Sequence, residues 1–435
     1  MSAAYLICPS KPAVPSTPPE RFSAEKPSVS SVRSVTVADI DGDGNLDLIS
    51  GALYDDKVNI LLGNGDGTFR AKLSFAAGDE PIWVVAKDIN NDGNLDIITA
   101  NHDEDKINIL LGNGDGTLKA RTSYAAGDNI RHVAVEDVNG DGNLDVIAVS
   151  EYDSKISVFL GNSDGTLKAR TSYGVGAAPV FATLADVNED GVLDIIGTSQ
   201  NEDKVDILLG NADGSFKLRV SYAGGDLTMS AALADLNNDG NVDIVASSWG
   251  ENSLGVLFGN GDGTFKAKVS YAAGQGAVTV ALGDLNHDGI LDLVSGSRDD
   301  DKLNVLLGNG SSTGYAVSGS AYDLAVADLD GDGAYDLLAT NLEESDVRVF
   351  MGNLAGGDIE SVLSILEGNG DGTFKVNTTL AALAGIREIE LNDFNGDGNA
   401  DIAYISEDTD RVVVHLSNGN GSYKAGVSYQ VGEKP

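Results

Sequence analysis

The sequence predicts an all-β fold, a β-propeller built from four-stranded antiparallel blades. Three observations carry this prediction: a repeat of 49 residues, strand-length apolar segments in every repeat, and Asn-Gly and Asp-Gly pairs between those segments. Asn-Gly and Asp-Gly accept the positive φ of tight hairpin turns. No repeat contains a convincing stretch with helical periodicity. Four short strands in a repeat of this length are typical of one propeller blade.

The repeat is anchored by an acidic nonapeptide with the pattern D-x-[DN]-x-D-G-x-x-D. The first five intervals between copies are 49 residues each, the next is 44 and the last is 65. The eight copies begin at Asp39, Asp88, Asp137, Asp186, Asp235, Asp284, Asp328 and Asp393. They predict eight blades, and seven blades plus a displaced repeat are the alternative. A linear β-solenoid is less favoured, because solenoid repeats are usually shorter and supply fewer strands.

Each repeat presents its four expected strands in a constant order. Alternating segments such as "SVTVADI" (34–40) lead into the acidic loop, and apolar runs such as "LDLISGA" (46–52) follow it. The segment "KVNILLGNGDGTF" (57–69) predicts a third strand and the turn into a fourth, "RAKLSFAAG" (70–78). The sixth repeat is shortened. The seventh is lengthened, because both "DVRVFMGN" (346–353) and "SVLSILEGNGDGTF" (361–374) resemble a third strand.

Two regions are expected along the chain: residues 1–27 as a Pro-rich leader or stalk, and residues 28–435 as the propeller. Residues 9–27 contain six of the nine prolines, so this segment favours a stiff, extended conformation. A disordered tail is the equally weighted alternative. Both "RFSAEKP" (21–27) and "SYQVGEKP" (428–435) resemble the end of a fourth strand, so one of them could close the ring against the other end.

The charge balance disfavours several classes of partner. The chain has 67 acidic and 28 basic residues, a formal net charge of -39, which disfavours binding to nucleic acid or anionic lipid and favours cations. The single cysteine, Cys8, cannot form an intramolecular disulfide. No apolar run is long enough for a transmembrane segment, and the N-terminus lacks the basic region of a signal peptide. The sequence assigns no oligomeric state.

The nonapeptide has the chemistry of a calcium loop. Ca²⁺ takes six to eight oxygen ligands at about 2.3–2.6 Å, and alternate residues of a tight loop can direct oxygens inward. Side chains are expected to bind from the first, third, fifth and ninth places. The seventh place would bind through its backbone carbonyl, since it is apolar in three copies. The second place is always apolar, as expected of a plug that anchors the loop to the core.

The predicted ligands, repeat by repeat, are Asp39, Asp41, Asp43, Asn45, Asp47; Asp88, Asn90, Asp92, Asn94, Asp96; Asp137, Asn139, Asp141, Asn143, Asp145; Asp186, Asn188, Asp190, Val192, Asp194; Asp235, Asn237, Asp239, Asn241, Asp243; Asp284, Asn286, Asp288, Ile290, Asp292; Asp328, Asp330, Asp332, Ala334, Asp336; and Asp393, Asn395, Asp397, Asn399, Asp401. Up to eight Ca²⁺ are expected, which would reduce the net charge from -39 to about -23. Because clustered carboxylates repel one another, the metal-free protein should be less stable.

Two other interpretations of the loop are disfavoured. An EF-hand requires a bidentate Glu at its twelfth place, where this chain has Ser50, Thr99 and other non-acidic residues, and the flanking segments are strand-like. A set of plain acidic turns would not keep the same oxygen-bearing pattern in eight copies.

The repeat "DINNDGNLDIITAN…INILLGNGDGT" resembles the FG-GAP/VCBS repeat, the unit of the integrin α-subunit propeller and of many bacterial surface proteins. The resemblance covers roughly residues 28–435. It implies a propeller with Ca²⁺ in the loop between the first two strands of each blade, and an extracellular or cell-surface role in adhesion or glycan binding. Such extracellular modules bind Ca²⁺ at about 10⁻⁴–10⁻³ M. Integrin propellers have seven blades, so the eight copies depart from that pattern.

The sequence does not predict an enzyme. It has no phosphate loop, zinc-ligand spacing or nucleophile elbow, and its four histidines do not recur in the repeat. Trp83 and Trp249 are expected near the propeller rim, and the recurring Tyr124, Tyr173, Tyr222 and Tyr271 are expected to pack between blades. Three functions stay open: a calcium-stabilised surface or secreted module that binds a protein or glycan, a multivalent lectin, and a sugar-active lyase or dehydratase on a propeller scaffold.

Overall fold

The fold was analysed in a computed structural model of the chain. The structure describes residues 32–432, with the exception of 286–289, 298, 300–301, 309–311, 317–320, 328–335, 342–345, 351–362, 369–373, 381–385, 407–408 and 420–421. The expected leader, residues 1–27, therefore lies outside the described residues and stays a prediction.

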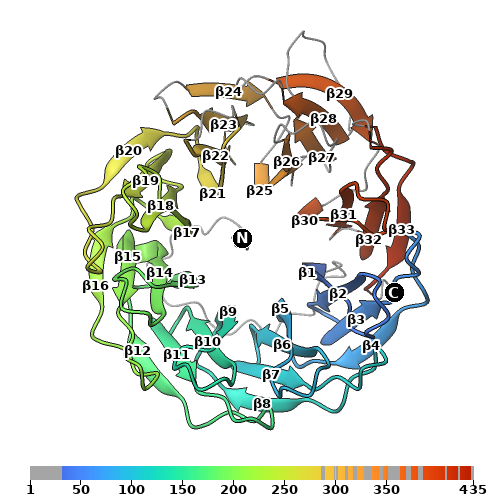
Figure 1. Ribbon diagram of the computed structural model, residues 1–435, viewed down its shortest axis with the longest axis horizontal. Coiled ribbons are helices and arrows are strands. Elements are labelled where there is room, and N and C mark those ends of the chain that lie inside the picture. Colours follow the sequence, from blue (N-terminus) through green and yellow to red (C-terminus); the bar gives the residue numbers. More distant parts are fainter. Residues whose placement is uncertain are drawn as a thin grey trace, which may run out of the picture.

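Eight β-sheets, counted over the described residues, are arranged in a ring around a common axis (Figure 1). Seven have four strands and one has five. Each sheet follows its own stretch of the chain, with its first strand nearest the axis and its last strand at the periphery. The predicted all-β propeller is confirmed, and its sheets match the eight repeats one to one.

Strands of equal rank occupy equal positions in each repeat. The first strands are β1 (Val32–Ala38), β5 (Pro81–Lys87), β9 (Ile130–Glu136), β13 (Pro179–Ala185), β17 (Thr228–Ala234), β21 (Ala277–Gly283), β25 (Ala321–Ala327) and β30 (Ile386–Asn392). The second strands are β2 (Asp47–Ala52), β6 (Asp96–Asn101), β10 (Asp145–Ser150), β14 (Asp194–Ser199), β18 (Asp243–Ser248), β22 (Asp292–Ser297), β26 (Asp336–Asn341) and β31 (Asp401–Ser406). Every second strand thus begins at the ninth residue of the acidic motif.

The third strands are β3 (Lys57–Leu61), β7 (Lys106–Leu110), β11 (Lys155–Phe159), β15 (Lys204–Leu208), β19 (Ser253–Leu257), β23 (Lys302–Leu306), β27 (Asp346–Phe350) and β32 (Arg411–His415). The outer strands of the four-stranded sheets are β4 (Leu73–Ala76), β8 (Thr122–Ala125), β12 (Thr171–Gly174), β16 (Val220–Ala223), β20 (Val269–Ala272), β24 (Ser312–Ala316) and β33 (Val427–Gln430). A short 3₁₀ helix, η1 (Gln200–Glu202), follows β14.

The seventh repeat forms the five-stranded sheet. Its third strand, β27, is followed by β28 (Leu363–Gly368), which pairs in parallel with β27 and antiparallel with β29 (Phe374–Leu380). Both segments that resemble a third strand are therefore strands of one blade, and the extra length of this repeat is accommodated at the periphery.

The core lies between neighbouring blades. The second strands whose side chains are described are buried at every position, because blades cover both of their faces, whereas the described residues of the outer strands are exposed or only partly buried. Ile98 and Ile107 of the second blade, for example, pack in one cluster with Val133 and Val146 of the third. A continuous buried face on both sides explains why these strands are apolar throughout rather than alternating.

The first and last blades are in contact, so the array is a closed ring rather than a linear solenoid. The amide of Gly67 donates to the carbonyl of Phe394 at 3.1 Å. The ring of Phe69 meets those of Phe394 and Tyr429 edge-on, with centroids 5.8 and 5.2 Å apart. Each of these two blades is built from its own strands, so no strand is exchanged at the closure. The segment 21–27 lies outside the described residues.

Antiparallel pairing divides the loops between two faces. Loops between first and second strands share one face with the turns between third and fourth strands; we call this the motif face. Loops between second and third strands share the opposite face with the segments that connect one blade to the next; we call this the connector face. The backbone bond from His102 to Glu80 (2.9 Å) joins two such segments of the connector face.

The aromatic residues lie partly where the sequence predicts. Inter-blade packing of the recurring tyrosines is confirmed for Tyr124, whose hydroxyl accepts a bond from the amide of Leu167 in the next blade at 3.0 Å, and in the same way for Tyr173 and Tyr222. The expected rim position is wrong for Trp83, which lies within the first strand β5, nearest the axis (Figure 1). Trp249 directly follows β18, at the connector-face end of its blade, but its side chain is only 8% exposed and belongs to a core cluster. Both are drawn inward by the apolar area that burial removes from water.

Candidate metal centre

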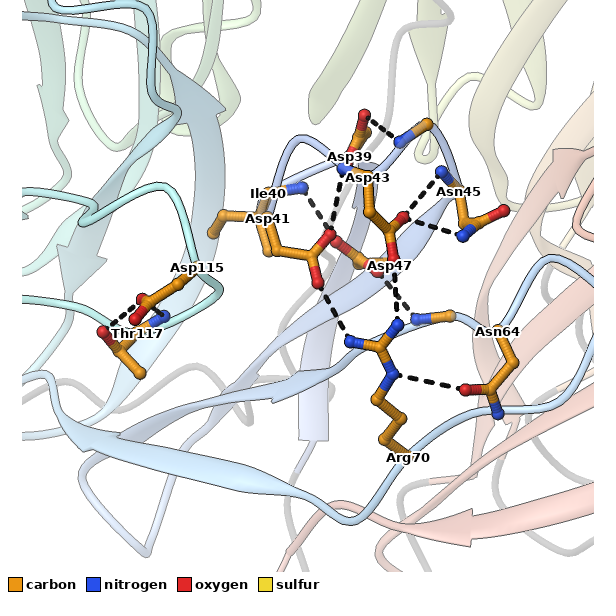
Figure 2. A network of polar contacts seen from close by, with 12 residues as sticks. Asp39, Ile40, Asp41, Asp43, Asn45, Asp47, Asn64, Arg70, Asp115 and Thr117 are labelled. Carbon is orange, nitrogen blue, oxygen red and sulfur yellow. Dashed lines mark hydrogen bonds and ion pairs between the residues drawn. The ribbon is translucent and has the colours of Figure 1, made fainter.

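The acidic motif folds into a loop whose carboxylates are arranged by its own backbone (Figure 2). The two oxygens of Asp39 accept bonds from the amides of Asp43 (3.1 Å) and Gly44 (2.9 Å). Asp41 accepts a second bond from the amide of Asp43 at 3.2 Å, and Asp43 accepts one from the amide of Asn45 at 2.9 Å. Short acidic side chains bond readily to nearby amides in this way, and Gly44 has the positive φ (87°) that the turn requires.

Three carboxylates converge in this loop. Asp39, Asp41 and Asp43 each contribute an oxygen to a cluster in which these atoms lie within 4.8 Å of one another. An all-oxygen donor set from alternate residues of a tight loop suits a hard cation such as Ca²⁺. The residues present at the first, third and fifth places therefore fit the predicted ion.

The same hydrogen-bond skeleton recurs in the other described loops. The amide of the fifth residue donates to the first aspartate at 3.1–3.2 Å in the loops that begin at Asp88, Asp137, Asp186, Asp235 and Asp393. The third residue is Asn in these loops, so among the loops that the structure describes only the first presents three clustered carboxylates. The predicted ligands Asn286, Asp288, Asp328, Asp330, Asp332 and Ala334 lie outside the described residues.

The ninth aspartate has a structural role that the sequence prediction missed. In Asp47, one carboxylate oxygen accepts the amide of Ile40 (2.8 Å) and the other accepts the amide of Gly63 (2.7 Å). The same pair of bonds recurs at Asp96, Asp145, Asp194, Asp243, Asp292 and Asp401. This carboxylate ties the start of the motif loop to the end of the third strand. Burial raises the pKa of Asp47, Asp96 and Asp401 to about 6.

The second and seventh places anchor the loop. Ile40 and Ile89 are 2% and 0% exposed, so the predicted apolar plug is confirmed for these loops. The side chain of Asn45 lies over Gly65 of the neighbouring turn, where a Cβ would approach its Oδ1 to 2.2 Å. Glycine is therefore required at Gly65 both by this contact and by its φ of 72°.

A basic residue that pairs with the loop in the first and third blades was also missed. Arg70 binds Asp41 and Asp43 through its two terminal nitrogens, at 3.1 and 2.9 Å (Figure 2). The amide of Asn45, and then Arg70, hold the pKa of Asp43 below its ordinary value. Lys168 lies at the equivalent place in the third blade, 3.7 Å from Asp141. The signal was present in the sequence, because Arg or Lys follows "GDGTF" or its variant in each of these repeats.

Comparisons with known proteins agree with this architecture. The profile of the FG-GAP-like repeat family matches six overlapping segments, 39–99, 88–148, 137–197, 186–246, 237–295 and 284–339, which together cover more than half of the chain. A search of curated proteins found no match.

Solved structures show the same fold at low sequence identity. Dihydro-heme d1 dehydrogenase NirN is 12% identical with a TM-score of 0.60, over 96% of this chain and 76% of that one. A lectin from Agrocybe aegerita that recognises non-reducing terminal N-acetylglucosamine is 20% identical over 75% of this chain and 88% of its own, with a TM-score of 0.46. BBS1N, solved in complex with ARL6DN, is 12% identical over 72% and 90%, with a TM-score of 0.47. Only the fold is inferred, and only from the similarity to NirN.

Proposed function

This chain belongs to the FG-GAP-like repeat family, and we propose that it is a calcium-stabilised, non-catalytic binding propeller of a secreted or cell-surface protein. Its ligand in this proposal is a protein or a glycan on a cell surface or matrix. The observation that carries the proposal is the convergence of Asp39, Asp41 and Asp43 in a loop whose backbone skeleton recurs around the ring.

Calcium would be held by the first, third and fifth residues of each loop, and its charge would offset their mutual repulsion. The position of the loops suggests how this could stabilise the ring. The turn of each blade packs on the motif loop of the preceding blade: the amide of Gly263 donates to the carbonyl of Val187 at 3.2 Å, as Gly67 does to Phe394. An ordered loop therefore presents a fixed surface to the next blade, and binding to the native state alone raises its stability.

The two faces differ in sequence character, which supports a binding role for one of them. The motif face repeats the same residues from blade to blade. The loops after the second strands do not: they read Leu53-Tyr54, His102-Asp103, Glu151-Tyr152, Gln200-Asn201 and Trp249-Gly250. Tyr152 is 66% exposed there. Varied loops on a rigid scaffold are where proteins commonly carry recognition, so we place the ligand on the connector face.

A non-catalytic role is favoured by the surroundings of two histidines. His132 is 7% exposed and packs between aromatic rings, and His415 is 1% exposed and stacks on Tyr404. Both therefore contribute to packing. Among the described residues, no helix is long and apolar enough to cross a bilayer.

Calorimetric titration of the full chain with Ca²⁺, with thermal unfolding in millimolar Ca²⁺ and in excess chelator, tests the stabilising role. We expect several ions bound and a lower melting temperature in chelator. Equal melting temperatures would overturn it. A glycan array probed with calcium-loaded protein, before and after chelation, tests the ligand class. Hits on one sugar class that are lost in Tyr152→Ala but kept in Lys168→Ala would place glycan binding on the connector face. A blank array would favour a protein ligand.

A further inference from the structure

A second, chemically different cluster lies on the connector face of the second blade. Glu80, His102 and Asp103 each offer one possible metal-ligand atom, and these atoms lie within 4.8 Å of one another. Asp103 Oδ1 lies 2.8 Å and Glu80 Oε2 lies 3.4 Å from His102 Nδ1. We propose that these three residues form a binding site for a transition-metal ion of the Zn²⁺ type, separate from the calcium loops.

The donor set favours this class of ion. Imidazole nitrogen suits Zn²⁺ and its first-row neighbours, whereas Ca²⁺ prefers sites made of oxygen alone. Bonds of about 2.0–2.2 Å to nitrogen and oxygen place two ligands of a tetrahedral ion roughly 3.3 Å apart. The separation between Glu80 and His102 already has this value, and Asp103 needs only a small outward movement of an exposed side chain.

The backbone holds the two halves of the cluster together. Glu80 belongs to the connector before β5, and His102 and Asp103 follow β6. The amide of His102 donates to the carbonyl of Glu80 at 2.9 Å, and the amide of Glu80 donates to Asp56 at 3.2 Å. The side chains of Glu80 and His102 are only 15% and 25% exposed. Two of the three ligands are thus positioned before any ion binds.

Asn129 gives independent support. It is 4% exposed, its Nδ2 lies 2.8 Å from His102 Nε2, and its Oδ1 has no hydrogen-bond partner among the described residues. Rotating the side-chain amide of Asn129 by half a turn would bring its Oδ1 to His102 Nε2, where Oδ1 could accept a hydrogen bond from Nε2–H. That tautomer leaves the Nδ1 lone pair free for a metal. A residue that fixes the tautomer through the second ring nitrogen is a usual feature of metal-binding histidines.

The cluster is not a product of the repeat. Where the second blade has His102 and Asp103, the third has Glu151 and Tyr152 and the fourth has Gln200 and Asn201. The site also opens toward solvent at Asp103, whose side chain is 57% exposed. An ion with three protein ligands here would keep one position for water or for a carboxylate of a partner.

Calorimetric titration with Zn²⁺, with saturating Ca²⁺ present throughout, tests the proposal in the full chain. Co²⁺ is the spectroscopic probe, because a tetrahedral nitrogen–oxygen site gives intense visible absorption. We expect one Zn²⁺ per chain, and loss of both signals in His102→Gln and Glu80→Gln. Asn129→Ala should lower the affinity for Zn²⁺ about 10–100-fold. The matched control is Glu136→Gln, which removes a carboxylate 49% exposed on the chain surface.

Wild-type stoichiometry and affinity in His102→Gln would overturn the proposal, since Zn²⁺ would then be bound by the acidic loops. Absence of the Co²⁺ bands in wild-type protein would also overturn it. Melting temperatures in Ca²⁺ identify any variant that fails to fold, and Glu80→Gln and His102→Gln serve as replacements for each other. The proposed Zn²⁺ site does not depend on the proposed calcium function. If the Ca²⁺ titration shows no binding, the Zn²⁺ titration can still be interpreted, because it tests different residues.

Discussion

The side-chain amide of Asn59, in β3, donates a hydrogen bond to the backbone carbonyl of Val431, 372 residues further along the chain. The same bond joins neighbouring blades inside the array, from Asn108 to the carbonyl of Ala77 (2.8 Å) and from Asn304 to that of Ala273 (2.8 Å). The ring therefore closes with a contact that also joins neighbouring blades within the array. No special closing device is needed.

Asn59→Ala should lower the free energy of unfolding by about 1–3 kcal/mol, because it removes the main donor to a buried carbonyl. Asn59 is 1% exposed. Asn108→Ala, which removes the equivalent bond within the array, is the matched control and should have a similar effect. The measurement is urea unfolding in calcium. A neutral Asn59→Ala beside a destabilised Asn108→Ala would show that the ring does not close through this contact in solution.

The periodicity of the sequence was sufficient to predict the blades and the order of strands within them. Each blade buries its strands against the next blade, so the same apolar pattern must recur in every repeat. This pattern can therefore be recognised from the sequence alone. The seventh repeat was harder, because "DVRVFMGN" and "SVLSILEGN" both satisfy the pattern of a third strand. Only pairing decides between them, and β27 and β28 pair with each other. The sequence did not indicate the packing of the tryptophans, because their burial depends on neighbouring blades.

Asp96 tests the structural role of the ninth motif residue. Asp96→Ala leaves the amides of Ile89 and Gly112 without their acceptor, and each unsatisfied buried donor costs about 1–3 kcal/mol. We expect a large loss of stability even in chelator, where no ion contributes. Asp92→Ala, in the same loop but exposed, should be much milder in chelator. Equal effects of the two substitutions would assign Asp96 no special structural role.

The candidate site was predicted unevenly for a related reason. Ligand type and spacing are local, so the first, third and fifth places could be identified from nine residues. The bonds of Asp47 to Gly63 and of Arg70 to Asp41 and Asp43 span 16 to 29 positions. They form only when the third and fourth strands return to the motif face, which a motif by itself does not indicate.

Arg70→Gln should lower the melting temperature more in chelator than in calcium. In the metal-free loop Arg70 is the cation that Asp41 and Asp43 share, whereas bound Ca²⁺ would take over that charge. The effect in chelator should shrink at high salt, because surface charges are then screened. Arg121→Gln, which removes a guanidinium paired with Glu104 instead, is the control and should respond equally with and without calcium. The measurement is the melting temperature of both variants in calcium and in chelator. An equal effect of Arg70→Gln in the two buffers would contradict the prediction.

His132 occupies the same repeat position as Trp83 and Phe181, and its ring packs at a tilt between theirs across three consecutive blades. The His132 ring lies 4.5 Å from that of Trp83 and 4.9 Å from that of Phe181. Its Nδ1 has no partner among the described residues, and the adjacent Arg131 pairs with Glu151 instead (3.4 Å). Burial lowers the pKa of His132 to about 3.

This buried imidazole should make the fold sensitive to acid. Its ordinary pKa is 6.5 and its folded pKa is about 3, so the unfolded chain binds a proton between these values that the folded chain does not. The contribution of His132 to stability should therefore fall as the pH decreases below about 6.5, by about 2 kcal/mol at pH 5. The raised pKa values of Asp47, Asp96 and Asp401 act in the opposite direction, because the folded chain then binds the protons, so only a comparison with a His132 variant isolates this contribution. His132→Phe keeps an aromatic ring, as Phe181 does in the next blade, and removes the titration. Between pH 7 and pH 5, the free energy of unfolding, measured with urea in calcium, should change about 2 kcal/mol more favourably for the variant than for the wild type. The same change in both proteins would mean that His132 does not contribute to the response.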